Sequence, residues 1–545
     1  MSLVAPLQAD VTAVINADAR VSAAPAQHPD LLRFITCGSV DDGKSTLIGR
    51  LLYDSKSIFE DQMEALDKDS RKFGTQGAEL DLALLVDGLA AEREQGITID
   101  VAYRYFATPR RAFIVADTPG HEQYTRNMAT GASSAELAII LIDARKGILP
   151  QTRRHSFIVS MLGVRHIAVA INKMDLVGFD KAVFDQISDD YRALAENLGF
   201  ESIKFFPLSA RDGDNVAAPS AQTPWFQGPP LLTYLETVTV TSVSSVGGAL
   251  LPVQWVSRPN LDFRGFAGTL VRGTLNVGDT ITALPRGSKS KVTRIVTADG
   301  DLAEASEGQA ITLTLADEID VSRGDVLVSG SDVPVPARRL AAHLLWTGDR
   351  PLASGAAYIL KLGTTLADAR IVIENAVDIH SYAAQPATTL DMNGIATAQV
   401  ILDRPLVAVP YRDNRDLGGF ILIDRFTNET IAFGLVDSVL DDTEHSATAA
   451  AAIPSTRLVD RAGSFLLGRR GAQLEVPHQE WALLILTTLV SALVVWALTG
   501  SGLLAAVFGV ADLILRPLVT SVWTRFARRQ PPADTGPFHD DGADI

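Results

Sequence analysis

The chain has 545 residues, of which 47% are hydrophobic and 21% charged, and its formal net charge is −16 at pH 7. A chain of this length divides into two to four domains of about 100–200 residues, and its acidic balance disfavours a nucleic-acid surface, so we expect no nucleic-acid partner. Cys37 is the single cysteine, which excludes an intramolecular disulfide and a thiolate metal cluster.

The hydrophobic pattern predicts an α/β domain followed by one or two small β-barrel domains and an apolar helical tail. Strand and helix patterns alternate in the first part, and short strands separated by Gly and Pro follow. The N-terminal segment lacks the basic and apolar regions of a secretory signal. The expected segments are a flexible lead 1–30, the α/β domain 31–235, β-barrels 245–335 and 336–442, a linker 443–479, a helical hairpin 480–525 and a polar tail 526–545.

The stretch "GSVDDGKST" from Gly38 fits the pattern G-x-x-x-x-G-K-[ST]. A β-rich run precedes it and helical spacing follows, which is the strand–loop–helix context of a phosphate-binding loop. We expect backbone N–H groups to surround the phosphates and Lys44 to reach the β and γ oxygens. The Ser45 hydroxyl is expected to bind Mg²⁺. This motif by itself fits many ATPases equally well.

Two further stretches predict a switch that responds to the γ-phosphate. In "EREQGITID", Thr98 is expected to close over the γ-phosphate and bring its hydroxyl to Mg²⁺. In "FIVADTPGHEQY", Asp117 would act on Mg²⁺ through water, and the N–H of Gly120 would sense the γ-phosphate. His121 follows directly, where an imidazole can orient the attacking water. No arginine finger can be assigned from the sequence.

The stretches "NKMD" and "SAR" predict that the base is guanine. The Asp175 carboxylate can accept two hydrogen bonds from the N1 and N2 donors of guanine, and adenine lacks that paired donor edge. A backbone amide of the loop that contains Ala210 is expected to meet the guanine O6. We therefore expect GTP and Mg²⁺ as the ligands.

The motifs together supply the candidate site residues. The catalytic candidates are His121, Lys44 and Thr98, and the metal ligands are Ser45, Thr98 and Asp117. The expected nucleotide-binding residues are Gly38, Ser39, Val40, Asp41, Asp42, Gly43, Lys44, Ser45, Thr46, Asp117, Thr118, Pro119, Gly120, His121, Asn172, Lys173, Met174, Asp175, Ser209, Ala210 and Arg211.

The combination of "GSVDDGKST", "EREQGITID", "DTPGHEQYTRNMATGAS", "INKMD" and "SAR" resembles the translation-factor GTPases, the superfamily of elongation factor Tu. Within it, "SVDDGKSTLIGRLLYDSK" and "DARKGILPQTRRHSFIVSMLGVRHIAVAINKMDLV" look like the GTPase subunit of ATP sulfurylase, or sulfate adenylyltransferase subunit 1. The likeness runs from about Leu31 to about Asp437. It implies a P-loop GTPase domain followed by two β-barrels.

The resemblance also implies an activity and a partner. GTP hydrolysis by this chain would be coupled to the reaction of ATP and sulfate, which forms adenosine 5′-phosphosulfate and pyrophosphate. A separate small subunit of the ATP-pyrophosphatase class would carry the adenylyl transfer, in a heterodimer or a larger complex. Two other hypotheses stay open: a translational GTPase that carries tRNA or acts on the ribosome, and a membrane-attached signalling switch without a coupled reaction.

The tail lies outside this resemblance. The run from Trp481 to Gly500 is almost entirely apolar and matches the ~20 residues that cross a bilayer. The following segment contains Asp512 and Arg516, which make it a costly second span. A transmembrane hairpin, a surface-lying second helix and a docking helix for a partner all fit. We expect a cytoplasmic protein that residues 481–523 attach to the cytoplasmic face of a membrane.

Overall fold

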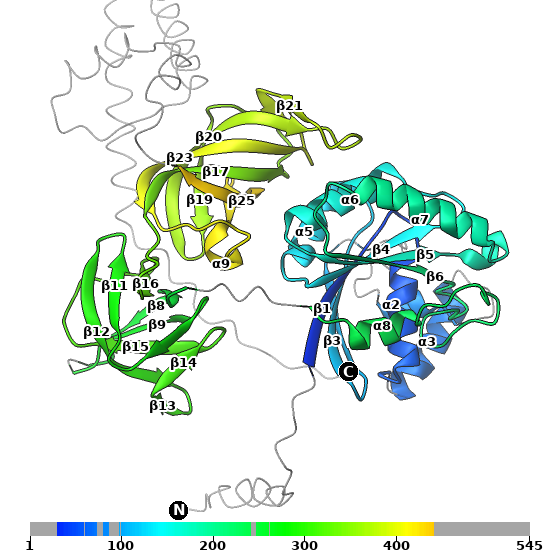
Figure 1. Ribbon diagram of the computed structural model, residues 1–545, viewed down its shortest axis with the longest axis horizontal. Coiled ribbons are helices and arrows are strands. Elements are labelled where there is room, and N and C mark those ends of the chain that lie inside the picture. Colours follow the sequence, from blue (N-terminus) through cyan, green and yellow to red (C-terminus); the bar gives the residue numbers. More distant parts are fainter. Residues whose placement is uncertain are drawn as a thin grey trace, which may run out of the picture. The chain divides into compact units, whose positions relative to one another are not determined.

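The computed structural model describes residues 30–58, 60–73, 80–86, 98, 100–240, 247–260 and 262–440. The predicted α/β region is confirmed, and so is the β-rich region with a β-barrel that follows it (Figure 1). The hydrophobic tail predicted over 480–525 lies outside the described residues. Among the helices that are described, none is long and apolar enough to cross a membrane.

A 6-stranded sheet with the order β2-β3-β1-β4-β5-β6 forms the centre of the first domain. β2 runs antiparallel to β3, and the other neighbours are parallel. Every residue of β4 is buried, as expected for an uninterrupted apolar run in the middle of a parallel sheet. The strands are β1 Asp30–Cys37, β2 Ala102–Ala107, β3 Arg111–Asp117, β4 Leu137–Asp143, β5 His166–Asn172 and β6 Ser202–Pro207.

Helices cover both faces of this sheet (Figure 1). One core contains Met128 of α5, Ile158 of α6 and Tyr191 of α7, and the other contains Leu47 of α2 and Leu235 of α8. Both faces of the parallel strands are therefore removed from water. The helices are α2 Lys44–Asp54, α3 Glu60–Phe73, α5 Thr125–Ser133, α6 Pro150–Met161, α7 Lys181–Ala195 and α8 Leu231–Thr237, with short 3₁₀ helices η1 Leu82–Leu85, η2 Glu122–Tyr124 and η3 Met174–Val177.

The next domain is built on an 8-stranded antiparallel sheet with the order β7-β16-β11-β12-β15-β9-β8, in which β13 also pairs with β12. Its strands enclose a separate apolar core that contains Phe266, Ile295 and Leu313. The strands of this sheet are β7 Leu250–Pro252, β8 Trp255–Ser257, β9 Gly265–Thr269, β11 Thr280–Leu284, β12 Ser288–Thr297, β13 Gly300–Leu302, β15 Ala310–Leu315 and β16 Val326–Ser329. A separate 2-stranded sheet pairs β10 Thr274–Asn276 with β14 Glu304–Ser306.

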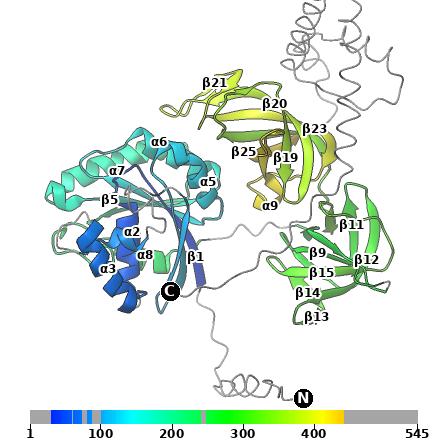
Figure 2. The same cartoon turned by 180° about the vertical axis from the view of Figure 1, so that it is seen from behind.

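The last described domain is a closed β-barrel (Figure 2). Its sheet has the order β19-β24-β25-β17-β23-β20-β21, and pairing of β19 with β20 closes the ring. Closure removes the unpaired edges that an open sheet would expose. The elements are β17 Ala337–Trp346, β18 Leu352–Ala353, β19 Ala357–Leu362, β20 Thr365–Val377, β21 Ala384–Pro386, β22 Thr389–Leu390, β23 Ile395–Leu406, α9 Arg415–Gly418, β24 Gly419–Ile423 and β25 Thr430–Leu440.

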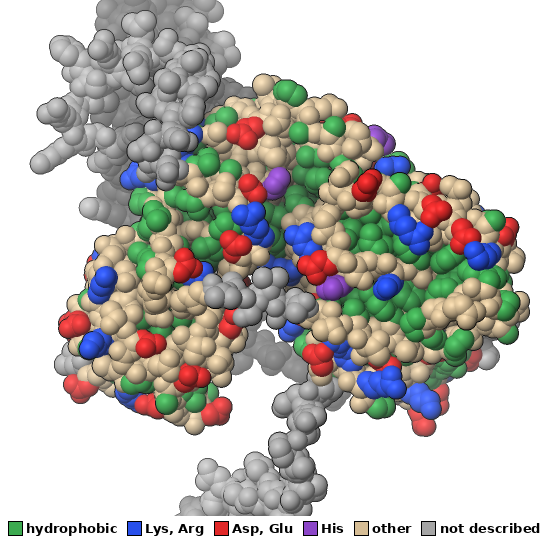
Figure 3. All heavy atoms as spheres, viewed as in Figure 1, with side chains coloured by type: hydrophobic (Ala, Val, Ile, Leu, Met, Phe, Trp, Pro, Cys, Tyr) green, Lys and Arg blue, Asp and Glu red, His purple; other side chains and the backbone are tan. Residues whose placement is uncertain are grey.

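Charged side chains of both signs are interspersed on the face drawn in Figure 3. Charged side chains of the described residues also form ion pairs on the surface, such as Arg294 with Asp301 and Arg192 with Asp189. Exposed pairs of this kind contribute little to stability. The stability of the described domains therefore rests mainly on their apolar cores.

A cluster of aromatic rings supports β3, the strand that ends at Asp117. Phe113 is 1% exposed, and its ring stacks on that of Phe106 with centroids 4.7 Å apart. Phe113→Ala should destabilise the α/β domain by about 3–5 kcal/mol, because it removes a fully buried ring from a packed core. Thermal unfolding of the full chain measures this. Phe426→Ala is the control, because Phe426 is 85% exposed; equal unfolding temperatures for the two variants would contradict the prediction.

Candidate active site

The phosphate loop lies between the end of β1 and the start of α2. Asp41 and Gly43 adopt left-handed backbone conformations, with φ of 65° and 92°. A Cβ atom on Gly43 would lie 2.5 Å from Nδ2 of Asn172, so glycine is required there. The Ser39 N–H donates to Oδ2 of Asp42 at 2.6 Å. The loop is thus tightly folded before a helix start without a side-chain cap, an arrangement suited to binding phosphate.

Lys44 opens α2 and turns its side chain back over the loop. Its Nζ donates to the carbonyl oxygens of Gly38 at 3.3 Å and Ser39 at 2.9 Å. Burial lowers the pKa of Lys44, and the carboxylates of Asp117 and Asp42 oppose that shift. An ammonium group held inside a phosphate-binding loop in this way is positioned to meet phosphate oxygens.

Asp117, at the end of β3, collects hydroxyl groups from three other segments. Its Oδ2 accepts from Ser45 Oγ at 2.9 Å and from Thr98 Oγ1 at 3.4 Å, and its Oδ1 accepts from Thr36 Oγ1 at 3.2 Å. Oγ of Ser45 and Oγ1 of Thr98 are themselves 3.4 Å apart. Burial raises the pKa of Asp117, whereas the positive charge of Lys44 and these hydrogen bonds lower it.

The three predicted metal ligands, Ser45, Thr98 and Asp117, are therefore adjacent in space. Two hydroxyls and one carboxylate are hard oxygen ligands, which suit Mg²⁺ held jointly with phosphates. In the described part of the chain, no group of three or more His, Cys, Asp or Glu side chains could hold a metal ion.

Gly120 follows β3 and presses against the phosphate loop. A Cβ atom there would lie 2.6 Å from Nζ of Lys44 and 2.9 Å from the backbone of Ser39 and Val40. This close approach gives a physical reason for glycine, because any side chain would push the two segments apart. His121 comes next, is partly buried, and directs its ring edge-on to Tyr124, with centroids 6.4 Å apart.

The predicted base-reading residues line one hollow of about 200 Å³. Asn172 connects the phosphate loop to the loop that contains Ala210. Its Nδ2 donates to the Asp42 carbonyl at 2.8 Å, and its Oδ1 accepts from the Ala210 N–H at 2.9 Å. Asp175 lines the hollow and lies 3.5 Å from a guanidinium nitrogen of Arg211. The structure thus joins the "NKMD" and "SAR" stretches to the phosphate loop.

Lys173 also lines this hollow, and its side chain is fixed by two contacts. Its backbone is left-handed, with φ of 63°, and its Nζ donates to the Asp41 carbonyl and lies 3.2 Å from Oδ2 of Asp143. Hydrogen bonds from Arg145 and Lys173 outweigh burial and hold the pKa of Asp143 well below its usual range. The carboxylate at the end of β4 therefore stays ionised and fixes Lys173 in place.

Several residues take positions that the motifs do not reveal. Met174 is fully buried in the core between the sheet and α7, so its side chain does not line the base hollow. Thr36 bonds to Asp117, and Arg50 of α2 donates to the Ala210 carbonyl at 3.2 Å. His155 of α6 accepts a hydrogen bond from the Gly38 N–H. No motif spacing marks these contacts, because each partner comes from a distant segment or from within a strand.

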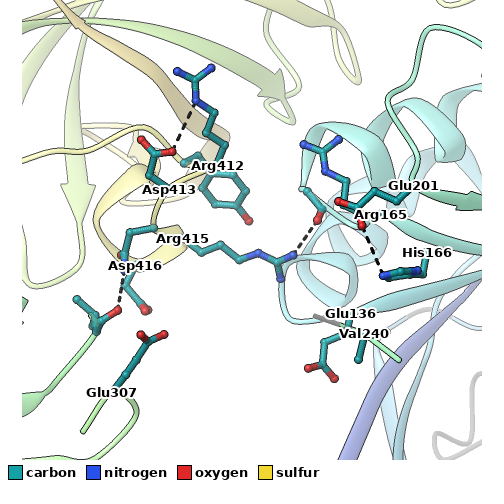
Figure 4. A pocket seen from close by; sticks show the side chains of 14 residues that line it. Glu136, Arg165, His166, Glu201, Val240, Glu307, Arg412, Asp413, Arg415 and Asp416 are labelled. Carbon is teal, nitrogen blue, oxygen red and sulfur yellow. Dashed lines mark hydrogen bonds and ion pairs between the residues drawn. The ribbon is translucent and has the colours of Figure 1, made fainter. Parts of the chain in front are cut away.

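A larger hollow, of about 460 Å³, lies elsewhere and is lined by charged side chains (Figure 4). Many of its polar groups already have protein partners. Arg415 donates to the backbone carbonyls of Ala135 at 3.2 Å and Gly163 at 3.0 Å, and His166 lies 3.9 Å from Glu201. The predicted site residues do not line it. Its Arg415 contacts join the barrel domain to the ends of α5 and α6.

Comparisons with known families match the two ends of the described region. Residues 29–257 match the family described as "Elongation factor Tu GTP binding domain", and residues 339–437 match "GTP-eEF1A C-terminal domain-like". The first match supports GTP as the ligand of the nucleotide site. It spans every predicted site residue, from the phosphate loop to Arg211.

Curated relatives are similar over most of their own length. The protein named "Sulfate adenylyltransferase subunit 1" in Yersinia pseudotuberculosis serotype O:1b (strain IP 31758) is 57% identical to this chain. The match covers 76% of this chain and 87% of the relative. The protein of that name in Aeromonas salmonicida (strain A449) is 58% identical, over 75% and 87%. A match to a solved structure of sup35 complexed with GDP covers 78% of this chain and 98% of that chain, at 22% identity and with a TM-score of 0.35.

The position of Asp175 predicts the outcome of a base-specificity experiment. Asp175→Asn should lower affinity for GTP by roughly 10- to 100-fold, because a neutral amide replaces the carboxylate that we expect to accept hydrogen bonds from guanine. It should also shift preference toward xanthosine triphosphate, whose base offers the complementary pattern. Competition binding with the two nucleotides measures both effects. Asp189→Asn, on the exposed face of α7, is the control; unchanged preference in Asp175→Asn would contradict the base-reading role.

Proposed function

The chain belongs to the sulfate adenylyltransferase subunit 1 family, and we propose that it is the GTP-hydrolysing regulatory subunit of that enzyme. In this role, GTP hydrolysis drives the conversion of ATP and sulfate to adenosine 5′-phosphosulfate and pyrophosphate. The observation that carries the proposal is that the side-chain oxygens of Ser45, Thr98 and Asp117 lie within 3.4 Å of one another beside the phosphate loop. Identity of 57% over 87% of a curated relative supports the assignment.

Each element of the site has a role in GTP turnover. Backbone N–H groups of the loop and Lys44 bind the phosphates, and Asp175 selects guanine. Ser45, Thr98 and Asp117 would hold Mg²⁺, which neutralises phosphate charge when bound. Thr98 and Gly120 lie on the segments that respond to the γ-phosphate, so its loss releases them.

His121 is the residue that orients the attacking water in this proposal. Its place directly after Gly120 supports the assignment, because Gly120 approaches Lys44 and the phosphate loop closely. The backbone of His121 is extended, with φ of −79° and ψ of 144°, and η2 begins at the next residue. Closure of this segment on a bound γ-phosphate would move the His121 imidazole toward the water that attacks that phosphate.

Sulfate activation needs such a drive for a chemical reason. The phosphosulfate anhydride is much less stable than the phosphate anhydride that it replaces, so the adenylation of sulfate runs uphill. We propose that the adenylyl transfer takes place on a small subunit of the ATP-pyrophosphatase class, in a heterodimer or a larger complex. The present chain supplies the nucleotide switch, and its candidate site residues all serve GTP.

One assay tests this function directly. The full chain is combined with an active small subunit, and pyrophosphate release from ATP is measured with and without GTP and sulfate. Release should require both, and Lys44→Ala should lower GTP hydrolysis and pyrophosphate release together by about 100-fold or more, because it removes a cation from the reacting phosphates. Lys361→Ala, at an exposed position of β19, is the control.

Two outcomes would overturn the coupling. Normal pyrophosphate release by Lys44→Ala would separate sulfate activation from GTP. GTP hydrolysis that is indifferent to ATP, sulfate and the small subunit would leave a nucleotide switch without this reaction.

We also propose that residues 481–523 attach a cytoplasmic protein to a membrane. The almost entirely apolar run from Trp481 to Gly500 and the tryptophans near its ends support this. The full chain should be recovered with membranes after cell fractionation and should resist a high-salt wash. Leu486→Arg combined with Leu489→Arg should release it, because each charge at mid-span costs about 2.5–3.5 kcal/mol. Recovery of the unmodified chain in the supernatant would contradict the proposal.

A further inference from the structure

His155 connects a distant helix to the first residue of the phosphate loop. The Gly38 N–H donates to its Nδ1 at 3.2 Å, across a separation of 117 residues in the sequence. The imidazole lies on α6, between the sheet and that helix, and is 0% exposed. No motif of the nucleotide site contains this residue, and it makes no base or metal contact in the roles described above.

The direction of this hydrogen bond determines the state of the ring. Nδ1 accepts, so the imidazole is neutral and carries its proton on Nε2. Burial lowers the pKa of His155 to about 3, and the positive charges of Lys44 and Arg154 act in the same direction. The ring therefore remains an acceptor toward Gly38 throughout the neutral pH range.

A histidine at this buried position leaves one polar ring nitrogen without a hydrogen-bond partner in the described part of the chain. Nε2 of His155 is buried and has no hydrogen-bond partner among the described residues. A buried polar group left without a partner destabilises the fold, whereas an apolar side chain of similar shape would avoid that cost. The acceptor at Nδ1 is the feature that distinguishes histidine from such a side chain.

Gly38 is held from two directions. His155 binds its N–H, and Lys44 Nζ donates to its carbonyl oxygen at 3.3 Å. There is little room for adjustment, because a Cβ atom on Gly38 would lie 2.9 Å from the Leu141 carbonyl oxygen. The orientation of the first peptide units of the loop therefore depends on the groups that bind them.

The helix that carries His155 is itself fixed in position. Arg154 lies 2.8 Å from Glu122, in the segment that follows His121. On the other side, Ser156 Oγ and Tyr191 OH are 3.0 Å apart, which ties α6 to α7. These contacts tie α6 to its neighbouring elements, and the hydrogen bond from Gly38 to His155 is the contact between α6 and the phosphate loop that the proposal uses.

We propose that His155 is a positioning residue of the phosphate loop, and that its Nδ1 orders the Gly38 peptide for nucleotide binding. The proposal rests on the proposed GTP-binding function. His155 acts through Gly38, with no contact to the nucleotide. Its removal should weaken nucleotide binding by the value of one buried hydrogen bond, while the chain remains folded.

Two substitutions separate the acceptor from the shape of the side chain. His155→Asn keeps an acceptor, because Oδ1 branches from Cγ as Nδ1 does. His155→Leu fills a similar space without an acceptor. We expect His155→Leu to weaken GDP binding by the full chain about 3- to 10-fold, and His155→Asn to stay within about 2-fold of the unmodified protein. Calorimetric titration with GDP measures the dissociation constants.

Ser156→Ala is the matched control on the same helix. It removes a buried hydrogen bond to Tyr191 of α7, which belongs to neither the phosphate loop nor the base hollow. It should lower the unfolding temperature of the nucleotide-free chain but leave GDP affinity unchanged. His155→Leu, in contrast, should weaken GDP binding more than Ser156→Ala does, and a lower unfolding temperature should not account for that loss.

The outcomes distinguish the positioning role from the proposed function. If the unmodified chain fails to bind GDP, the GTP-binding function fails, and this proposal fails with it. If the unmodified chain binds GDP and His155→Leu binds it equally well, only the positioning role is overturned. Equal weakening in His155→Asn and His155→Leu would also overturn it, because the acceptor would then be irrelevant.

Discussion

The buried carboxylate of Asp117 is the constraint on which the nucleotide site depends. A charge removed from water must be compensated by hydrogen bonds and opposite charge. Here the compensation comes from hydroxyls of Thr36, Ser45 and Thr98 and from the positive charge of Lys44. These groups come from β1, α2 and the segment before β2, so one carboxylate holds separate parts of the chain together. The same oxygens form a set suited to a divalent cation bound with phosphates.

Sheet order explains how that carboxylate comes to lie beside the phosphate loop. β1 is flanked by β3 and β4, and β5 follows β4, all in parallel. The carboxyl ends of parallel strands meet at one edge, which is where ligands bind in open α/β sheets. Asp117 ends β3, Asp143 ends β4 and Asn172 ends β5. The phosphate loop leaves β1 at the same edge, so binding groups that are far apart in sequence become neighbours.

The local motifs could be recognised from sequence because each contains its own geometry. A phosphate loop needs a glycine with positive φ immediately before a helix, and Gly43 meets that need. The predictions that Ser45, Thr98 and Asp117 bind a metal ion and that Asp175 reads the base rest on motifs of the same local kind. Met174 was assigned to the nucleotide site by its place in a motif, but its side chain packs in the core. Spacing along a chain does not show which way a side chain points after a 3₁₀ turn.

Sequence by itself determined the phosphate-loop motif and the match to a GTP-binding domain family, and it predicted a carboxylate that reads guanine and hydroxyls that bind a hard cation. Only the tertiary structure decided how these groups are supported. The bond from Gly38 to His155, and that from Arg50 to Ala210, join residues from separate elements. Such contacts depend on how helices pack against the sheet. Packing is set by the summed burial of many apolar side chains, which no short stretch of sequence contains.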